Sequence, residues 1–245
     1  MSEAPGRLYV VATPIGNLGD ASPRSIEVLR DVDVIAAEDT RRTRRLLSHF
    51  GIGTRLLSYH DHNEDRVSGE ILERLREGDD VALVSDAGTP LIADPGYRVV
   101  ALCAESGVEV VAVPGPSAAL AALSVAGLPP HPFHFAGYLP RKSGARRRRL
   151  EALGALGCTL VVYESPHRIA AMMRDAAEVL GERGAVIARE LTKVHEEVIR
   201  GTLGELAEAA ERRDLKGEMV VVIEGSSAAE DGRQGQGESP ESGSH

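Results

Sequence analysis

The sequence contains no tryptophan and only eight aromatic residues among its 245 positions. Stacking of bases on aromatic rings is a main source of affinity in proteins that bind single-stranded nucleic acid. Only Phe135, Tyr59 and Tyr138 fall near predicted loops. If the partner is an RNA, we therefore expect contacts to its shape and its phosphates to dominate.

Cysteine is also scarce, with two residues that are separated by 55 positions. Cys103 and Cys158 each lie in an apolar run, and neither is part of a Cys-x-x-Cys motif or a Cys/His cluster. This pattern supports neither a disulfide framework nor a zinc site. We expect both thiols to be buried and structural.

Long hydrophobic runs are absent. No segment approaches the 18 consecutive apolar residues that a membrane-spanning helix requires, and the first seven residues lack the apolar core of a signal peptide. We expect a cytoplasmic protein with no membrane partner.

Lysine is rare, with three residues against 25 arginines, and the formal net charge is −9. Residues 226–245 carry four acids, one arginine and no large apolar side chain, so we expect a disordered tail and a folded part with a net charge of −6. The basic residues cluster despite this acidity, in segments 41–45 and 141–149. Such clusters are typical of phosphate-binding surfaces, although the preference for arginine could also produce a solvated helix face.

Short apolar runs alternate with helix-forming segments along the first half of the chain. The predicted strands are residues 8–12, 32–36, 55–58, 81–85 and 108–113; the predicted helices begin at Pro23, after an N-cap at Ser22, and cover residues 40–49, 63–77, 96–106 and 117–125. This alternation predicts an α/β fold with a mainly parallel sheet.

Pro129, Pro130 and Pro132 interrupt this pattern, and we place a domain boundary there. The second half is predicted to be α/β with some antiparallel strands: strands at 133–138, 159–163, 185–188, near 195–200 and at 218–224, and helices at 147–156, after Ser165 and Pro166, and at 202–213. We therefore expect an N-terminal α/β domain over residues 1–127, a C-terminal α/β domain over residues 133–225, and the tail.

Three loops rich in glycine and proline follow predicted strands of the first half, at residues 13–20, 85–96 and 114–118. Ligands of open α/β sheets bind at the carboxyl ends of the strands, where such loops allow the backbone to approach closely. None of the loops has the spacing of a P-loop or of the dinucleotide-binding fingerprint. Asp86, at a strand end, suits a ligand that offers hydroxyls or an amine.

These loops, together with Ala37-Glu38-Asp39-Thr40-Arg41 and Glu164-Ser165-Pro166-His167-Arg168, give the chain a marked family resemblance. From about residue 7 to residue 225 it resembles the ribosomal RNA small subunit methyltransferase I family, in the same order and spacing. That family belongs to the tetrapyrrole methylases, also called class III methyltransferases, which use S-adenosyl-L-methionine. The resemblance implies two α/β domains with the donor site in the interdomain cleft, and a homodimer.

The resemblance also implies an activity, which is 2′-O-methylation of the ribose of a cytidine in the decoding region of 16S rRNA. The partner would be 16S rRNA within an assembled small ribosomal subunit. Transferred position by position, the donor-binding residues would be Pro14, Ser85, Asp86, Ala87, Gly88, Ser117, Ala118, Tyr163, Glu164, Ala188 and Met219. The RNA-binding residues would be Arg41, Arg42, Arg44, Arg45, Arg141, Arg146, Arg147, Arg148 and Arg149.

A ribose hydroxyl is a weak nucleophile, so a general base or a nearby cation would assist the transfer. Lys193, His167 and His60 are our candidates for that role, and each also has a purely structural interpretation. Lys193 is one of three lysines in an arginine-rich chain, which hints at a role for a titratable ammonium. His60 and His62 lack a third ligand at suitable spacing, so we expect no metal.

Two alternatives remain open from the sequence. A C-methyltransferase that acts on a cyclic tetrapyrrole would share the donor pocket, and its acidic substrate could also use arginines. A non-catalytic RNA-binding assembly factor would keep the fold without a donor. The two arginine clusters disfavour the first alternative, and the intact glycines of the three loops disfavour the second.

Overall fold

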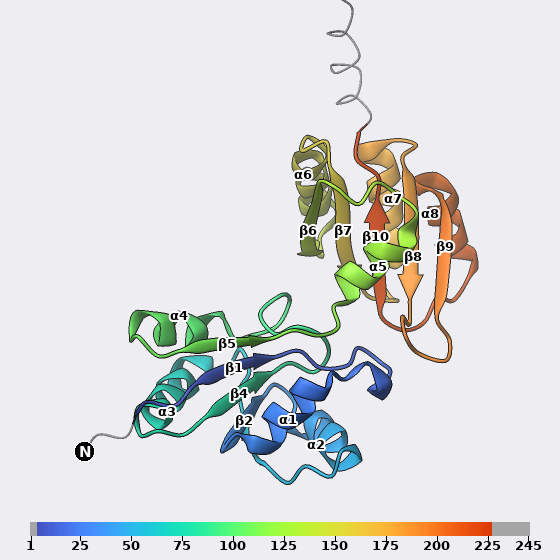
Figure 1. Ribbon diagram of the computed structural model, residues 1–245. Coiled ribbons are helices and arrows are strands. Elements are labelled where there is room, and N and C mark those ends of the chain that lie inside the picture. The colour runs from blue at the N-terminus through green and yellow to red at the C-terminus, as the bar shows by residue number, and fades with distance from the viewer. Residues whose placement is uncertain (1–3, 227–245) are drawn as a thin grey trace, which may run out of the picture. The chain divides into compact units, whose positions relative to one another are not determined.

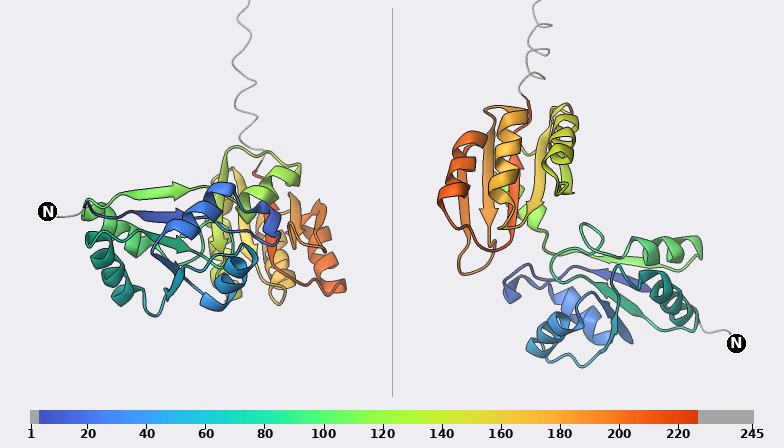
Figure 2. Two further views of the ribbon diagram at one scale, coloured as in Figure 1. Left: turned by 60° about the horizontal axis from the view of Figure 1, so that its bottom comes forward. Right: turned by 180° about the vertical axis from the view of Figure 1, so that it is seen from behind.

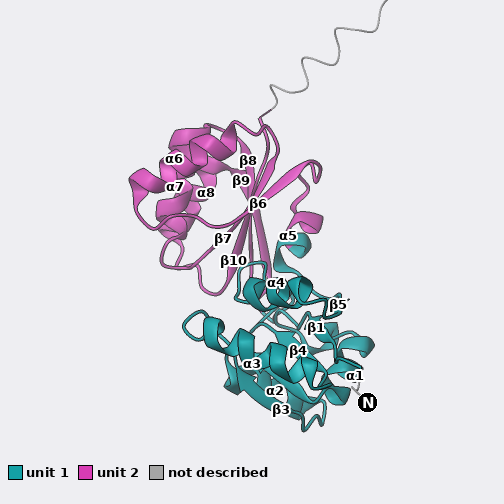
Figure 3. Cartoon of the chain, turned by 90° about the vertical axis from the view of Figure 1, so that its left-hand side faces the viewer, with its two compact units in different colours: residues 1–121, 191–194 teal, residues 122–190, 195–245 magenta. Residues whose placement is uncertain are grey.

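The computed structural model describes residues 4–226 and comprises two compact units. Unit 1 consists of residues 1–121 and 191–194, and unit 2 of residues 122–190 and 195–245 (Figure 3). The chain therefore divides inside a helix at 121/122, before the proline-rich segment where the sequence places the boundary. The predicted tail lies almost entirely outside the described residues.

Unit 1 is built on a parallel sheet of five strands in the order β3-β2-β4-β1-β5. The strands are β1 (Leu8–Val11), β2 (Val34–Ala37), β3 (Arg55–Ser58), β4 (Val81–Val84) and β5 (Val110–Val113). Every residue of β2 and β4 is buried, as expected for strands that are covered on both faces. The predicted parallel sheet is confirmed.

Helices cover both faces of this sheet (Figures 1 and 2). Leu29 of α1 (Pro23–Asp31) and Leu47 of α2 (Thr40–His49) pack on one face, and Ile71 of α3 (Glu64–Arg76) and Cys103 of α4 (Tyr97–Glu105) pack on the other. A short 3₁₀ helix, η1 (Leu18–Asp20), lies in the first loop. The buried Cys103, with its pKa raised to about 11 by desolvation, is the structural thiol that we predicted.

Local sequence explains where these helices begin. The hydroxyl of Ser22 accepts a hydrogen bond from the N–H of Ser25, and Pro23 occupies the first turn of α1. Asp39 caps α2 by accepting a hydrogen bond from the N–H of Arg41 at 2.8 Å. The predicted starts of both helices are confirmed.

Unit 2 has a mixed sheet in the order β6-β7-β10-β8-β9. Strands β6 (Phe133–Tyr138) and β7 (Thr159–Glu164) are parallel to each other, whereas β8 (Gly184–Arg189), β9 (Glu197–Thr202) and β10 (Met219–Ile223) pair in antiparallel fashion. This confirms the predicted mixture of α/β structure and antiparallel strands.

Three helices, α6 (Ser143–Gly154), α7 (Ile169–Leu180) and α8 (Leu203–Arg212), cover one face of this sheet. Helix α5 (Ala118–Ala126), whose residues 122–126 belong to unit 2, lies on the other face, over β8 and β10 (Figures 1 and 3). Helix α6 begins four residues earlier than predicted and α7 three residues after Pro166. Among the described residues, no helix has the length and apolar character that a bilayer crossing requires.

Candidate functional site

The connections after β1 and β4 leave the sheet of unit 1 toward opposite faces. These two strands are hydrogen-bonded neighbours, with Leu8 beside Val81 and Val10 beside Leu83. The chain continues from β1 into α1 on one face and from β4 into α4 on the other. Such a reversal defines the topological switch point, which is where open α/β sheets bind their ligands.

Hydrogen bonds join the three predicted loops at this point. Thr13 and Gly88 form an isolated antiparallel bridge with N···O distances of 2.9 and 3.0 Å. The hydroxyl of Thr13 donates to the carbonyl oxygen of Ser85, and the hydroxyl of Thr89 donates to the carbonyl oxygen of Pro116. The sequence therefore correctly predicts loops that meet in space, but it does not reveal Thr13 and Thr89 as the residues that connect them.

Two glycines make this close packing possible. Gly88 has a φ of +84°, and a Cβ added there would lie 3.4 Å from Ile15 Cγ2. A Cβ added at Gly115 would lie 3.0 Å from the Cβ of Ala12. Side chains at these positions would push the loops apart or strain the backbone.

Asp86 links this loop cluster to α2. One oxygen of its carboxylate accepts a hydrogen bond from the backbone N–H of Asp39 at 3.0 Å, and the other lies 3.5 Å from a guanidinium nitrogen of Arg42. The side chain is 24% exposed, so one edge of the carboxylate faces solvent. Asp86 thus connects the predicted donor loop to the predicted basic helix.

Further carboxylates gather at the same end of the sheet. Burial raises the pKa of Glu38, and the negative charges of Asp94 and Asp86 raise it further. Burial also raises the pKa of Asp94, partly opposed by a hydrogen bond from Ser85. The carboxyl end of β2 and β4 is therefore an acidic, partly desolvated surface.

The segment 191–194 is far from the first loop in sequence, yet it packs against it within unit 1. A Cβ added at Gly16 would lie 2.4 Å from Lys193 Cγ and 2.9 Å from Lys193 Cε. Glu190 and Thr192 adopt positive φ angles of 49° and 67° on either side of Leu191. Non-glycine residues rarely adopt such angles, and they concentrate at functional sites. The structure therefore places Lys193, a predicted catalytic residue, at the first predicted donor loop.

The other two catalytic candidates lie elsewhere. His60 is half-buried in the loop after β3, where its backbone N–H donates to Asn63 and its ring lies 5.9 Å from that of His62. His167 is exposed in the turn before α7, in unit 2. Of the three candidates, only Lys193 is shown to contact a predicted donor loop.

Four predicted donor residues meet at one end of the sheet of unit 2. Register pairs Glu164 with Met219, and Val220 with both Tyr163 and Ala188. The side chains of Ala188 and Met219 are buried within the unit, whereas Tyr163 is half-buried. The predicted residues of this group are adjacent, as their positions at strand ends require.

Glu164 is a buried carboxylate, 2% exposed, at this strand end. It accepts a hydrogen bond from the N–H of Ser165 at 2.8 Å and lies 3.1 Å from the guanidinium of Arg168. Burial raises its pKa, and these two neighbours oppose that rise. Arg168 also donates to the carbonyl oxygen of Leu139 at 2.7 Å, so this ion pair fixes the loop after β6.

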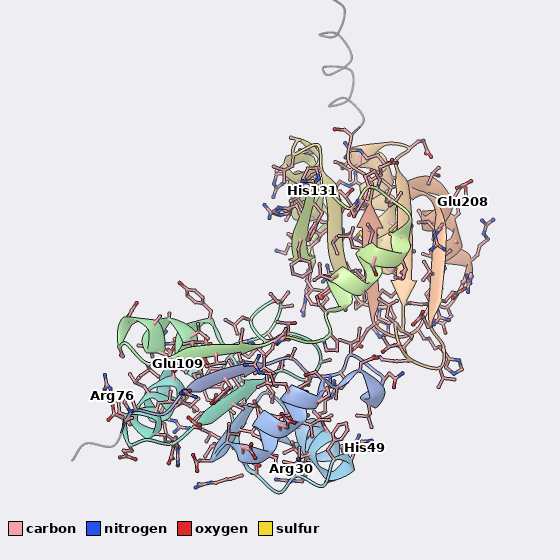
Figure 4. The ribbon with its side chains drawn as sticks, viewed as in Figure 1. Arg30, His49, Arg76, Glu109, His131 and Glu208 are labelled. Atoms are coloured by element: carbon pink, nitrogen blue, oxygen red, sulfur yellow. The ribbon has the colours of Figure 1, made fainter. Side chains whose placement is uncertain are left out.

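The arginines of the first cluster belong to α2, whose last residue, His49, is labelled in Figure 4. All four of its arginines are exposed: Arg41, Arg42, Arg44 and Arg45. Arg41 pairs with Asp39 at 3.0 Å and thereby lowers the pKa of that carboxyl to about 2. The helix therefore presents guanidinium groups along its solvent face.

The second cluster is not one surface, and the prediction for Arg146 is wrong. Arg146 is 4% exposed and donates to Asp175 at 2.7 Å and to the carbonyl oxygens of Pro140 and Arg141. Its guanidinium forms these bonds within unit 2, where it joins α6 to α7. Arg147 also pairs with Asp175, at 2.7 Å, which leaves Arg141, Arg148 and Arg149 as the exposed members.

Metal ligation finds no support in the described residues. Across residues 4–226, His, Cys, Asp and Glu side chains form no group of three or more that could hold a metal ion. The candidate site therefore consists of the three loops, the carboxylates near them and the ammonium group of Lys193.

Comparison with known proteins agrees with this arrangement. Residues 7–207 match the family model for tetrapyrrole (corrin/porphyrin) methylases. Solved structures with the same fold include a diphthine synthase, with a TM-score of 0.71 at 17% identity over 89% of this chain and 90% of that one. Another is the uroporphyrin-III C-methyltransferase of Thermus thermophilus complexed with S-adenyl homocysteine, with a TM-score of 0.64 at 19% identity over 89% and 97%.

Curated relatives are much closer in sequence. The ribosomal RNA small subunit methyltransferase I of Micromonospora olivasterospora is 54% identical over 91% of this chain and 72% of its own length. The protein of the same name from Escherichia coli O157:H7 is 53% identical over 92% of this chain and 80% of its own length. With half of its residues shared across nine-tenths of its length, and with the loop cluster that its sequence predicts, the chain belongs to the ribosomal RNA small subunit methyltransferase I family of tetrapyrrole methylases.

Proposed function

We propose that this protein transfers a methyl group from S-adenosyl-L-methionine to the ribose 2′-oxygen of a cytidine in the decoding region of 16S rRNA, within an assembled small ribosomal subunit. The observation that carries the proposal is identity of about one half, across nine-tenths of the chain, to relatives that are named for methylation of small-subunit RNA. The hydrogen-bonded loop cluster of unit 1 supports it.

The loops at the switch point fit a donor of this kind. Gly88 has a positive φ that disfavours a side chain, and a Cβ at Gly115 would lie 3.0 Å from that of Ala12, so glycine lets the backbone itself line the cluster. A solved structure with this fold, a uroporphyrin-III C-methyltransferase, is complexed with S-adenyl homocysteine. We assign donor binding to Pro14, Ser85, Asp86, Ala87, Gly88, Ser117 and Ala118 of unit 1, and name Tyr163, Glu164, Ala188 and Met219 of unit 2 as further candidates.

When bound, S-adenosyl-L-methionine supplies an electrophilic methyl group on a sulfonium. The protein must align the acceptor oxygen and exclude water. Lys193 supports the proposal because its stem lies against Gly16 in the first donor loop. In this role its amine assists loss of the hydroxyl proton, either as a base or as a cation beside the oxygen.

Replacement of Lys193 tests this role. Lys193→Met should lower kcat by roughly 10²–10⁴-fold, the range of general acid–base catalysis, while donor affinity stays within about twofold. Lys193→Arg should retain activity if a fixed cation suffices, and should lose activity if the amine must accept the hydroxyl proton. An unchanged kcat for Lys193→Met would remove Lys193 from the mechanism.

RNA binding is assigned to the exposed arginines of α2, Arg41, Arg42, Arg44 and Arg45, and to the exposed members of the second cluster, Arg141, Arg148 and Arg149. Contacts to phosphates release counterions, so affinity should fall steeply with salt. Residues 1–225 have a net charge of −6, which disfavours indiscriminate binding and favours a structured target. A flat response to salt would count against this surface.

We further propose that the protein acts in the cytoplasm as a homodimer. Helix α5 exposes Leu120 at 56% and Val125 at 41%, which supports an apolar contact with a second copy. Sedimentation of the purified protein should give about twice the chain mass of 26.1 kDa. A mass of one chain at micromolar concentration would contradict the dimer.

The experiment that tests the function uses labelled donor. The protein is incubated with S-adenosyl-L-methionine carrying a radioactive methyl group and with small subunits from cells that lack the modification. The label should enter the 16S rRNA of the subunits. It should enter protein-free 16S rRNA more slowly. Asp86→Ala should weaken donor binding, and binding of donor without transfer to RNA would favour a small-molecule acceptor such as a tetrapyrrole.

A further inference from the structure

Three of the eight aromatic residues gather at one edge of the sheet in unit 2. The ring of Tyr163 on β7 contacts the rings of Phe135 and Tyr138 on β6, with centroids 4.9 and 5.7 Å apart and interplanar angles of 70° and 65°. Both pairs have the edge-to-face geometry that aromatic rings prefer. Phe135 and Tyr163 are half-buried, but Tyr138 is 60% exposed.

A β-bulge creates this cluster. Phe135 and Tyr138 are three residues apart, so in a regular strand their side chains would point to opposite faces of the sheet. Phe135 pairs with Val161 and Tyr138 with Tyr163, so four residues of β6, from Phe135 to Tyr138, lie opposite three residues of β7. Gly137 takes the positive φ, +61°, that the bulge needs. The bulge thus turns Tyr138 onto the same face as Phe135 and Tyr163.

The contribution of the Tyr138 ring to folding stability does not explain the bulge. Leu160 and Val162 of β7 face the core beneath α6, α7 and α8, so Tyr163 and the rings that touch it lie on the opposite face. A ring that is 60% exposed buries little apolar area. The bulge therefore holds an aromatic ring at the surface, in contact with a second ring that fixes its position.

Cations follow the exposed ring directly. Arg141 and Lys142 are exposed in the loop after Tyr138, and Arg168 fixes that loop through Leu139. No acidic residue lies between Tyr138 and Arg149. A ring beside cations matches the two parts of a nucleotide, since a base can stack on the ring while the phosphate pairs with a guanidinium or an ammonium.

We propose that Tyr138 is the platform on which one unpaired base of the RNA substrate stacks, with Arg141 and Lys142 contacting the neighbouring phosphates. This inference rests on the proposed function, because it takes the substrate to be RNA. It makes Tyr138 a positioning residue for the acceptor. The exposed cations that follow Tyr138 in the loop favour a nucleic acid over an apolar peptide or a second copy of this chain.

The test compares two variants with a matched control. Tyr138→Ala should raise the KM for small subunits by between about fivefold and 100-fold, the range for loss of one stacked base, while Tyr138→Phe stays within about twofold. Tyr97→Ala is the control because Tyr97, in α4, is also exposed, at 78%, and its ring stacks on no other aromatic ring among residues 4–226. Donor affinity, measured by calorimetry with S-adenosylhomocysteine, should not change in any variant.

A fluorescence measurement reports the contact itself. The chain has no tryptophan, so Tyr138→Trp introduces a single reporter. Its emission should be quenched when small subunits or a decoding-region RNA bind, whereas that of Tyr97→Trp should not change.

Four results would overturn the proposal. They are an unchanged KM for Tyr138→Ala, the same loss for Tyr138→Phe, a loss of donor affinity, and a shift from dimer to monomer. The last two would assign the ring to the donor site or to a contact between copies. If the wild-type protein itself fails to methylate RNA, the proposed function fails instead, and that result is separate from any comparison of variants.

Discussion

At the scale of single residues, four consecutive arginines of α6 have different environments. Arg146 is buried against Asp175, Arg147 shares that carboxylate from a half-exposed position, and Arg148 and Arg149 are exposed. Because a helix turns by about 100° per residue, neighbours in sequence face different directions. A run of like charges in the sequence therefore mixes a core ion pair with a solvent-facing surface.

Arg146 and Arg149 should separate stability from RNA binding. Arg146→Ala removes the buried one of the two guanidinium partners of Asp175 and should lower the free energy of unfolding by about 3–5 kcal/mol. Arg149→Ala should change it by less than about 0.5 kcal/mol and should weaken RNA binding instead. Urea unfolding and subunit binding at two salt concentrations measure both effects. Equal losses of stability would contradict the buried role of Arg146.

Asp39 gives a prediction for pH. Hydrogen bonds from Arg41 lower the pKa of this carboxyl from 3.8 to about 2. A carboxyl whose pKa is lower in the folded state stabilises the fold above its unfolded pKa, and this contribution disappears as pH falls through the folded pKa. The stability difference between the wild type and Asp39→Asn should therefore be constant above about pH 5 and should shrink between about pH 4 and pH 2. A difference that does not change down to pH 2 would contradict this pairing.

At the scale of elements, the loops around the switch point depend on glycine. Gly88→Ala places a Cβ on a residue with a φ of +84°, close to Ile15, and should cost about 1–2 kcal/mol of stability. Displaced loops should also weaken donor binding by about tenfold or more. Calorimetry with S-adenosylhomocysteine and thermal unfolding measure the two effects.

Gly69 provides the matched control for this substitution. It lies within α3, and a Cβ added there would meet nothing within 4 Å. Gly69→Ala should raise stability by about 0.5–1 kcal/mol, because alanine favours a helix, and should leave donor affinity unchanged. Equal donor affinity in the Gly88 and Gly69 variants would show that the loop cluster does not bind the donor.

Elements with strong local signals were predictable from the sequence. Ser22 and Pro23 mark the start of α1, the boundaries of α2 match the prediction, and Thr202 with Glu205 forms a capping box at the start of α8. The bulge in β6 was not predicted. It depends on pairing with β7, and the interior glycine of the strand, Gly137, is the one sequence signal that could have indicated it.

At the scale of the whole molecule, the sequence predicted both α/β units and the three loops, because each loop is a local pattern at the end of a strand. It did not predict that residues 191–194 pack with unit 1, nor that Arg146 is buried. Both depend on contacts between segments far apart in the chain. Lys193 was singled out only because lysine is rare here, and the structure adds its contact with Gly16.

The measurement that tests the central claim most directly is the identity of the methylated nucleoside. Small subunits methylated by the protein with labelled S-adenosyl-L-methionine are digested to nucleosides and separated, with mass analysis of the labelled peak. Our account predicts a single product, 2′-O-methylcytidine, from the decoding region of 16S rRNA. Label on a base, at another ribose, or only on an added tetrapyrrole would contradict it.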